Sequence, residues 1–278
     1  MAEPLLIEVF ITPHFNLAAT SLFIDPFRVA NYLSGIQHFK WRYISTGPSE
    51  VISSSGLPVH IAKKGTKNSP ADILVISSSW TPEEYKATEL NVALSNFART
   101  GKQIVALDTG SLILANAGLL DGKRATVHYE HIDAFIEQFP NVDVTEDLFT
   151  LDGNIATCCG GVAVVDLALH ILRDKIGEGI ANKVARYIFH HAVRGPDSQQ
   201  NPKASEPLGK TVPTQLRAAI DLMEQNLEDR LTISEICKNL QISQRHLTRL
   251  FQTFVKRSPV QYYSDIRLDR ARGLVTQT

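Results

Sequence analysis

The chain has 278 residues, a length that corresponds to about two domains. Its composition, 44% hydrophobic and 21% charged, is that of an ordinary globular protein and excludes low-complexity and collagen-like classes. No apolar run approaches the ~20 residues that a membrane-spanning helix needs, and the N-terminus lacks the basic segment of a signal peptide. We therefore expect a cytoplasmic protein without membrane contact. The 3 cysteines show no zinc-type spacing, so we expect reduced thiols, no metal and no cofactor.

The net charge of −1 conceals an uneven distribution along the chain. Residues 210–278 carry eleven Lys and Arg against seven Asp and Glu, whereas residues 1–209 carry 17 against 22. A local basic excess is typical of segments that contact nucleic-acid phosphates. Residues 194–212 are rich in proline, glycine and polar side chains, which is typical of a linker. The sequence thus predicts a first domain over residues 1–193, a linker over 194–212 and a second domain over 213–278.

Strand-like and helix-like segments alternate along the first domain. Short continuous apolar runs at Ile73–Ile76 and Ile104–Leu107 are typical of parallel strands that helices cover on both faces. The alternation predicts a parallel α/β sheet. The expected strands are 5–12, 39–45, 71–77 and 103–107, the expected helices are 20–33, 82–99 and 162–172, and 51–61 is expected to form a β-ribbon.

A sharp strand-to-helix turn is expected directly after Leu107. Asp108, Thr109 and Gly110 occupy this turn, where small residues allow the backbone to bend and the next helix begins with free N–H groups. Doubly wound sheets bind ligands at the carboxyl ends of their strands. The turn is therefore the expected ligand pocket.

Four further side chains are expected around this pocket. Phe15 and Trp80 follow strand ends and could form aromatic walls, His128 could hydrogen-bond a ligand, and Cys158 precedes another turn at Gly160. Simpler alternatives remain open for each. The aromatic rings could be ordinary packing, His128 a structural residue, Cys158 a buried thiol and Asp108 a helix cap.

The first domain resembles a known family through these residues. The elbow Asp108-Thr-Gly, the run Ala-Gly-Leu-Leu-Asp-Gly over 117–122, Ala125-Thr-Val-His and the segment 155–170 resemble the class I glutamine-amidotransferase-like (PfpI-type) domain, in the version fused to AraC-type modules. The resemblance covers about residues 5–190 and implies a flavodoxin-like, doubly wound parallel sheet. Enzymatic relatives place a cysteine at the elbow and a supporting acid near 16–21. Here the elbow residue is Asp108 and no acid occupies 16–21, so we expect no catalytic residue and no enzyme.

From Pro213 onward the pattern becomes purely helical. A capping box at Thr232 predicts a short helix that ends near Leu240, and a tight turn separates it from a helix over 244–254. Two short helices around such a turn indicate a helix-turn-helix, whose second helix enters the DNA major groove. The apolar stripes expected to form its core are Leu216, Ile220, Met223 and Leu227 on the first helix, and Leu247, Leu250, Phe251 and Phe254 on the last.

The exposed face of that last helix carries residue types that read base edges or hold phosphates. We expect major-groove contacts from Gln244, Arg245, His246, Thr248 and Arg249, and phosphate contacts from Lys256 and Arg257; a merely solvated surface is the alternative. With the segment 258–272, this region resembles the AraC/XylS family over about residues 213–275. That family carries two helix-turn-helix units, and we expect the second to be absent here.

These observations predict a dimeric, ligand-responsive transcription regulator that binds a double-stranded DNA operator. Relatives with this fusion sense amino acids, guanidino compounds or quaternary ammonium metabolites and activate catabolic genes, which implies a similar small-molecule effector here. A carboxylate beside aromatic rings would suit a cation. Two alternatives stay open: a hydrolase or amidotransferase-like enzyme with an accessory helical module, and a truncated regulator that senses its ligand without tight DNA binding.

Overall fold

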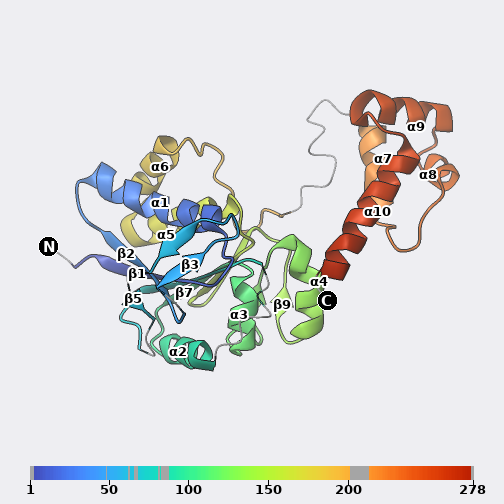
Figure 1. Ribbon diagram of the computed structural model, residues 1–278. Coiled ribbons are helices and arrows are strands. Elements are labelled where there is room, and N and C mark those ends of the chain that lie inside the picture. The colour runs from blue at the N-terminus through green and yellow to red at the C-terminus, as the bar shows by residue number, and fades with distance from the viewer. Residues whose placement is uncertain are drawn as a thin grey trace. The chain divides into compact units, whose positions relative to one another are not determined.

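The computed structural model divides into two compact units, which meet in the sequence between Gln200 and Asn201 (Figure 1). It describes residues 3–47, 49–61, 63–65, 68–80, 82, 88–200 and 213–276. The strands are β1 (Leu5–Ile11), β2 (Phe39–Ser45), β3 (Glu50–Ile52), β4 (Pro58–His60), β5 (Lys63–Lys64), β6 (Ile73–Ser78), β7 (Gln103–Asp108), β8 (Arg124–Ala125), β9 (Asp143–Val144), β10 (Phe149–Asp152) and β11 (Ile155–Cys158). The helices of the first unit are α1 (Leu17–Ser34), α2 (Thr88–Ala98), α3 (Gly110–Asn116), the 3-10 turn η2 (Tyr129–His131), α4 (Ile132–Gln138), α5 (Ala163–Ile176) and α6 (Glu178–Tyr187).

A seven-stranded sheet with the order β10-β11-β7-β6-β1-β2-β5 forms the centre of the first unit. All neighbouring strands pair in parallel except β10 and β11, which are antiparallel. The sheet confirms the predicted flavodoxin-like, doubly wound α/β fold. The predicted ribbon is also confirmed, because β3 pairs antiparallel with β4 outside the main sheet.

Two apolar cores lie on opposite faces of the sheet because successive strand residues point to opposite sides. On β6, Val75 belongs to one core and Ile76 to the other. Helices α1, α5 and α6 cover the first face, and α2, α3 and α4 cover the second, as the layers in Figure 1 show. Strands β1, β6 and β7 lie at the centre of this sheet, between the two helical layers. The elbow, Asp108 to Gly110, is at the carboxyl end of β7.

The start of helix α1 differs from its predicted start. Helix α1 begins at Leu17, three residues before its predicted start, because the side chain of Asn16 caps it by accepting from the backbone N–H of Ala19. Helix α2 is described from Thr88 to Ala98, and residues 83–87 of the predicted helix lie outside the described part of the chain.

The segment 194–200, predicted as the beginning of the linker, hydrogen-bonds to the first unit. Arg194 binds the buried carboxylate of Asp166, and Leu148 N–H donates to Ser198 O across 2.7 Å. Gln199 forms an isolated antiparallel bridge with Asp147. The rest of the predicted linker, 201–212, lies outside the described residues.

The second unit is a small helical domain with its own core. Its helices are α7 (Thr214–Glu224), α8 (Ile233–Asn239), α9 (Gln244–Leu250), the π-turn η4 (Phe251–Val255) and α10 (Pro259–Thr276). The predicted capping box is confirmed, since the Thr232 hydroxyl accepts from Glu235 N–H and the Glu235 carboxylate accepts from Thr232 N–H. Ser243 caps α9 by accepting from His246 N–H. The helix-turn-helix is thus built from α8 and α9.

The prediction that one α-helix continues to Phe254 was wrong. Helix α9 ends at Leu250, and the five-residue π-turn η4 follows before Lys256 takes a left-handed conformation with φ of 61°. The wider turn adds a residue and shifts the side chains that follow. Consequently Val255 packs against the core, whereas Phe254 is 37% exposed instead of buried.

Within the part of the chain that the structure describes, no helix has the length and apolarity to cross a bilayer.

Candidate functional site

The elbow after β7 is a strained turn that glycine makes possible. Asp108 has a φ of 59°, a left-handed conformation that non-glycine residues adopt mainly in special turns. A Cβ on Gly110 would lie 2.4 Å from the carbonyl oxygen of Ile76, so only glycine fits there without displacing β6. Thr109, not Asp108, occupies the N-cap position of α3. The simple interpretation of Asp108 as a helix cap is therefore wrong.

The side chain of Asp108 is held by groups from three segments of the chain. Its Oδ2 atom accepts a hydrogen bond from Asn16 Nδ2 at 3.1 Å and from Ser79 Oγ at 3.3 Å. The backbone N–H of Thr109 also donates to it. A Cβ added to Gly160 would lie 3.0 Å from the carboxyl carbon, so the turn after β11 packs directly on this group.

Burial raises the pKa of the Asp108 carboxyl above its ordinary value. The residue is only 5% exposed, so water stabilises its charge poorly. His128 acts in the opposite direction and lowers this pKa, followed by the hydrogen bonds from Asn16 and Ser79. A positive charge placed near this carboxyl group would therefore stabilise its ionised form.

Buried hydroxyl groups line the strand ends beside Asp108. Thr12 Oγ1 donates to Ser78 Oγ at 3.0 Å, and the hydroxyls of Thr20 and Ser77 lie 2.7 Å apart. Thr109 Oγ1 donates to the carbonyl of Ser79 at 2.7 Å. Because these hydroxyls bind one another, they fix the ends of β1 and β6 against the elbow. The hydroxyl groups were not predicted, although the Ser-Ser-Ser run at 77–79 is the signal that could have revealed them.

His128 immediately precedes the 3-10 turn η2 and is partly exposed. Its side chain is 32% exposed, and its Nδ1 atom is 3.7 Å from Glu130 Oε2. Its ring lies 4.6 Å from that of Tyr129, measured between centroids. Among the groups that act on the pKa of Asp108, His128 is the first that lowers it.

The structure places the other three predicted site residues very differently. Trp80 is 64% exposed and can present a ring face to a ligand, but Phe15 is fully buried in the core under α1. Cys158 is also fully buried, and burial raises the pKa of its thiol well above the ordinary value, followed by its hydrogen bond with Cys159. Neither Phe15 nor Cys158 is open to a ligand in this conformation. We retain neither in the proposed site.

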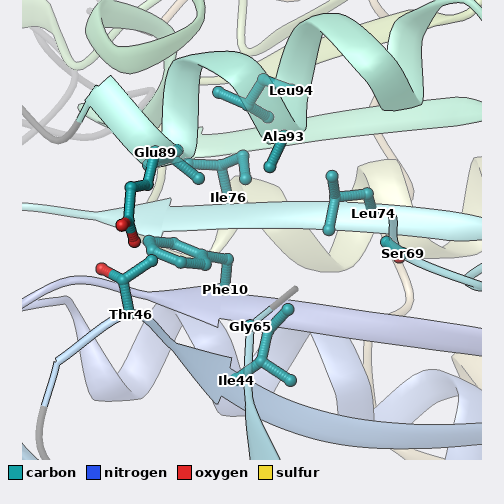
Figure 2. A pocket seen from close by; sticks show the side chains of 11 residues that line it. Phe10, Ile44, Thr46, Gly65, Ser69, Leu74, Ile76, Glu89, Ala93 and Leu94 are labelled. Carbon is teal, nitrogen blue, oxygen red and sulfur yellow. The ribbon is translucent and has the colours of Figure 1, made fainter. Parts of the chain in front are cut away.

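A small apolar cavity lies elsewhere in the first unit, between α2 and strands β1, β2 and β6. Figure 2 shows the ring of Phe10 inside it, with the carboxylate of Glu89 and the hydroxyl of Thr46 at one end. The cavity has a volume of about 40 Å³, far below the roughly 300 Å³ of small-ligand pockets. None of the predicted site residues lines it. At this volume the cavity is a packing gap.

Helix α9 presents the predicted polar face to solvent. Gln244, Arg245, Thr248 and Arg249 are exposed, whereas His246 is half-buried. The His246 Nε2 atom lies 2.9 Å from Gln215 Oε1, and its Nδ1 atom lies 3.2 Å from Arg249 Nη2. His246 thus connects α9 to α7 and orients Arg249.

The two residues predicted to bind phosphates lie just beyond η4. Lys256 is exposed in its left-handed conformation, while Arg257 forms an ion pair with Asp265 of α10. The exposed side chains of Gln252 and Thr253 extend the same region, and sequence reasoning missed them because the π-turn was not predicted. In the described residues, no cluster of His, Cys, Asp or Glu could hold a metal ion.

Comparison with protein families identifies both units. The model described as "DJ-1/PfpI family" matches residues 15–174, which is more than half of the chain. The model described as "Bacterial regulatory helix-turn-helix proteins, AraC family" matches residues 223–263, the region of α8 and α9. The chain belongs to the AraC-family transcriptional regulators that carry a DJ-1/PfpI domain. It is a regulator rather than an enzyme.

Individual relatives agree with this assignment along most of the chain. The chain is 34% identical over 277 residues to the HTH-type transcriptional regulator GbdR of Pseudomonas aeruginosa, covering 99% of this chain and 75% of that protein. It is 32% identical over 266 residues to the HTH-type transcriptional regulator GlxA of Rhizobium meliloti, covering 95% and 82%. A solved structure, an AraC family transcriptional regulator from Pseudomonas putida, is similar with a TM-score of 0.62 and 26% identity, covering 66% of this chain and all of that chain.

Proposed function

We propose that this regulator binds a small cationic metabolite, amino-acid-like or quaternary ammonium, at Asp108 and converts that binding into activation of catabolic genes. It works in the cytoplasm as a homodimer whose α9 helices contact an operator. The observation that carries the proposal is a single one. A carboxylate, held by Asn16 and Ser79, occupies the elbow where enzymatic relatives place a nucleophilic cysteine.

The chemistry of the elbow favours binding over catalysis. A carboxylate is a weak nucleophile unless a leaving group and a hydrolytic water are positioned around it. The nearby thiol of Cys158 is no substitute, because its raised pKa keeps it protonated and its burial keeps substrates away. The strained backbone at Asp108 therefore serves to project a binding group to the strand ends.

A cation explains why a carboxyl group is kept in so buried a place. An incoming positive charge would offset the cost of burying the ionised carboxylate of Asp108 and would lower its pKa. The exposed ring of Trp80 offers cation–π attraction, and His128 offers a hydrogen bond to a polar part of the ligand. Binding of such a cation should therefore strengthen as the pH rises through the raised pKa of Asp108.

A homodimer would place two copies of α9 on one operator. Helix-turn-helix dimers bind half-sites that lie about one turn of the DNA apart. The basic, exposed face of each α9 would then read one half-site.

Calorimetry on the full chain tests the effector class. Titrate L-arginine, choline, betaine and carnitine, here called cationic probes because each carries a guanidinium or quaternary ammonium group, with glutarate as an anionic comparison, into wild type, Asp108→Asn and the control Asp25→Asn. Asp25 is a surface residue paired with Arg28, so its variant keeps the elbow intact. We expect one of the cationic probes to bind to wild type and to Asp25→Asn, with at least tenfold weaker binding to Asp108→Asn. A preference for glutarate, or cation binding unchanged in Asp108→Asn, would overturn the proposal.

A further inference from the structure

The last three residues of the first unit are fixed to the segments beside the elbow. Gln200 N–H donates to Glu146 O at 2.8 Å, and Leu148 N–H donates to Ser198 O at 2.7 Å. Gln200 is also the residue after which the chain leaves this unit. Gln200 is thus held in place directly before the boundary between the two units in the sequence.

The side chain of Gln200 binds the segment after β8 that leads to His128. Its Nε2 atom donates to Thr126 Oγ1 at 2.7 Å, to Val127 O at 2.8 Å and to Asp147 O at 3.2 Å. Val127 immediately precedes His128 in the sequence. One side chain thus connects the exit of the unit to the wall of the proposed effector site.

Thr126 continues this connection to the elbow helix. It is fully buried, its carbonyl accepts from Ser111 Oγ at 2.6 Å, and its N–H donates to Thr157 Oγ1 at 2.7 Å. Ser111 lies three residues after Asp108, in the first turn of α3. Both sides of the proposed site, the elbow and the segment of His128, therefore meet at Thr126.

Residues 198–200, the exit segment of the first unit, are held by polar contacts that water could replace. Ser198, Gln199 and Gln200 have no apolar side chain, and Gln199 is exposed. The Oε1 atom of Gln200 is buried, yet within the described part of the chain it accepts no hydrogen bond. A buried unpaired acceptor disfavours the docked state and brings it closer in free energy to the released one. A regulatory switch requires two states of similar free energy, so that a ligand can shift the population from one to the other.

We propose that Gln200 couples the effector site to the DNA-binding unit by docking onto Thr126 and Val127 in one state and leaving them in the other. An effector that moves His128 or α3 changes the position of the Val127 carbonyl and the Thr126 hydroxyl, and so changes the balance between docked and released Gln200. This inference rests on the proposed function and names the regulation of the same site. By linkage, DNA must change effector affinity by the same factor.

The first test is amide hydrogen exchange on the full chain, without ligand or DNA. The variants are Thr126→Val, Ser111→Ala and Gln200→Ala. Thr145→Val is the matched control, because the buried Thr145 hydroxyl has no hydrogen-bond partner within the described residues. We expect the amides of Leu148 and Gln200 (or of the alanine at 200) to exchange at least tenfold faster in all three variants, and less than twofold faster in Thr145→Val. Unchanged exchange in Thr126→Val and Ser111→Ala would overturn the proposal.

The second test measures DNA affinity of the full chain with and without saturating choline or L-arginine. For the probe that shifts wild-type affinity at least fivefold, Gln200→Ala should reduce the shift to less than twofold, while Thr145→Val retains it. An undiminished shift in Gln200→Ala would contradict the coupling role. If neither these two probes nor betaine and carnitine shift wild-type affinity, the proposed effector class fails instead, and the exchange measurement alone decides whether Thr126 and Ser111 control the docking of Gln200.

Discussion

Asn16 and Asp108 form a hydrogen bond that joins the start of α1 to the elbow after β7, with 3.1 Å between Asn16 Nδ2 and Asp108 Oδ2. The other end of the same amide caps α1, since Asn16 Oδ1 accepts from Ala19 N–H. The amide therefore cannot rotate without losing one of the two bonds. Compared with the arrangement expected for enzymatic relatives, the acid now stands at the elbow and a neutral donor supports it. An acid at position 16 would repel Asp108.

The first prediction concerns the stability cost of Asp108. Its folded-state pKa is raised, so the neutral carboxyl favours the folded state, and that stability is lost as the pH rises through the folded-state pKa. Asp108→Asn removes the ionised group but keeps an acceptor for Asn16. We expect the variant to gain about 0.5–2 kcal/mol in the free energy of unfolding at pH 8. Urea denaturation from pH 3 to pH 8 measures this.

The pH profile of that difference provides the control. Below the ordinary carboxyl pKa of 3.8, both forms of the wild-type protein carry a neutral Asp108, and the advantage of Asp108→Asn should vanish. An advantage that stays constant over the whole pH range would show that packing, and not ionisation, sets the difference.

The second prediction concerns the glycine in the elbow. Gly110→Ala forces a Cβ into the carbonyl of Ile76, at a backbone atom that cannot give way without moving β6. We expect a loss of about 1–3 kcal/mol or more in the free energy of unfolding, as for other overpacked cores. Gly179→Ala in α6 is the matched control, because its Cβ meets no atom within 4 Å. Thermal denaturation of both variants should show a large fall only in Gly110→Ala.

The strand-to-helix elbow could be predicted from the sequence, but its interior could not. Small residues after an apolar strand indicate a turn, and the structure has that turn at Asp108 to Gly110. The partners of Asp108 come from residues 92 and 29 positions away in the chain, so no local pattern identifies Asn16 and Ser79. Phe15 shows the same limit, because its position after a strand end leaves open whether the ring points to the core or to the ligand.

In the second unit, prediction succeeded where local chemistry determines structure. The capping box at Thr232 and the cap at Ser243 each depend on residues three positions apart, and both are present. The π-turn over Phe251–Val255 depends on packing of Val255 against the domain core, which the sequence pattern does not distinguish from a continued α-helix.

The third prediction concerns the attachment of Arg194 to Asp166, a few residues before the chain leaves the first unit at Gln200. Asp166 is fully buried and accepts from Arg194 Nη2 at 2.7 Å and from Arg194 Nε at 3.0 Å, and its Oδ1 lies 2.7 Å from His190 Nε2. Arg194→Ala removes two charge-assisted bonds. Since the Arg194 side chain is 40% exposed, water replaces part of the loss, and we expect a destabilisation of about 1–2 kcal/mol.

Arg173→Ala provides the comparison for this prediction. Arg173 is an exposed residue of α5, and its removal should change the free energy of unfolding by less than about 0.5 kcal/mol. Equal losses in the two variants, measured by urea denaturation, would mean that the hydrogen bonds between Arg194 and Asp166 add nothing to the free energy of unfolding.

The fourth prediction separates base reading from phosphate binding on the second unit. Arg245→Ala should cost about 1–3 kcal/mol at one base position of a selected operator and little on other sequences. Lys256→Ala should weaken binding to all sequences alike and reduce the salt slope by roughly one unit. Arg99→Ala, an exposed arginine of the first unit, is the control and should change neither.

Fluorescence anisotropy on operator variants at several salt concentrations distinguishes these two outcomes. Identical behaviour of Arg245→Ala and Lys256→Ala on every sequence would show that α9 does not read bases through Arg245. Arg257 should contribute less than Lys256, because its ion pair with Asp265 must be broken or shared before it can hold a phosphate.

The central claim is that a cation bound at Asp108 controls DNA binding. The most direct measurement is the affinity of the full chain for an operator selected from random DNA, titrated with the cationic probe that calorimetry identifies, in wild type and in Asp108→Asn. We predict a change of at least fivefold in wild-type affinity on adding the probe, and a change of less than twofold in Asp108→Asn. An equal response in both proteins, or sequence-specific binding that no cationic probe alters, would contradict the claim.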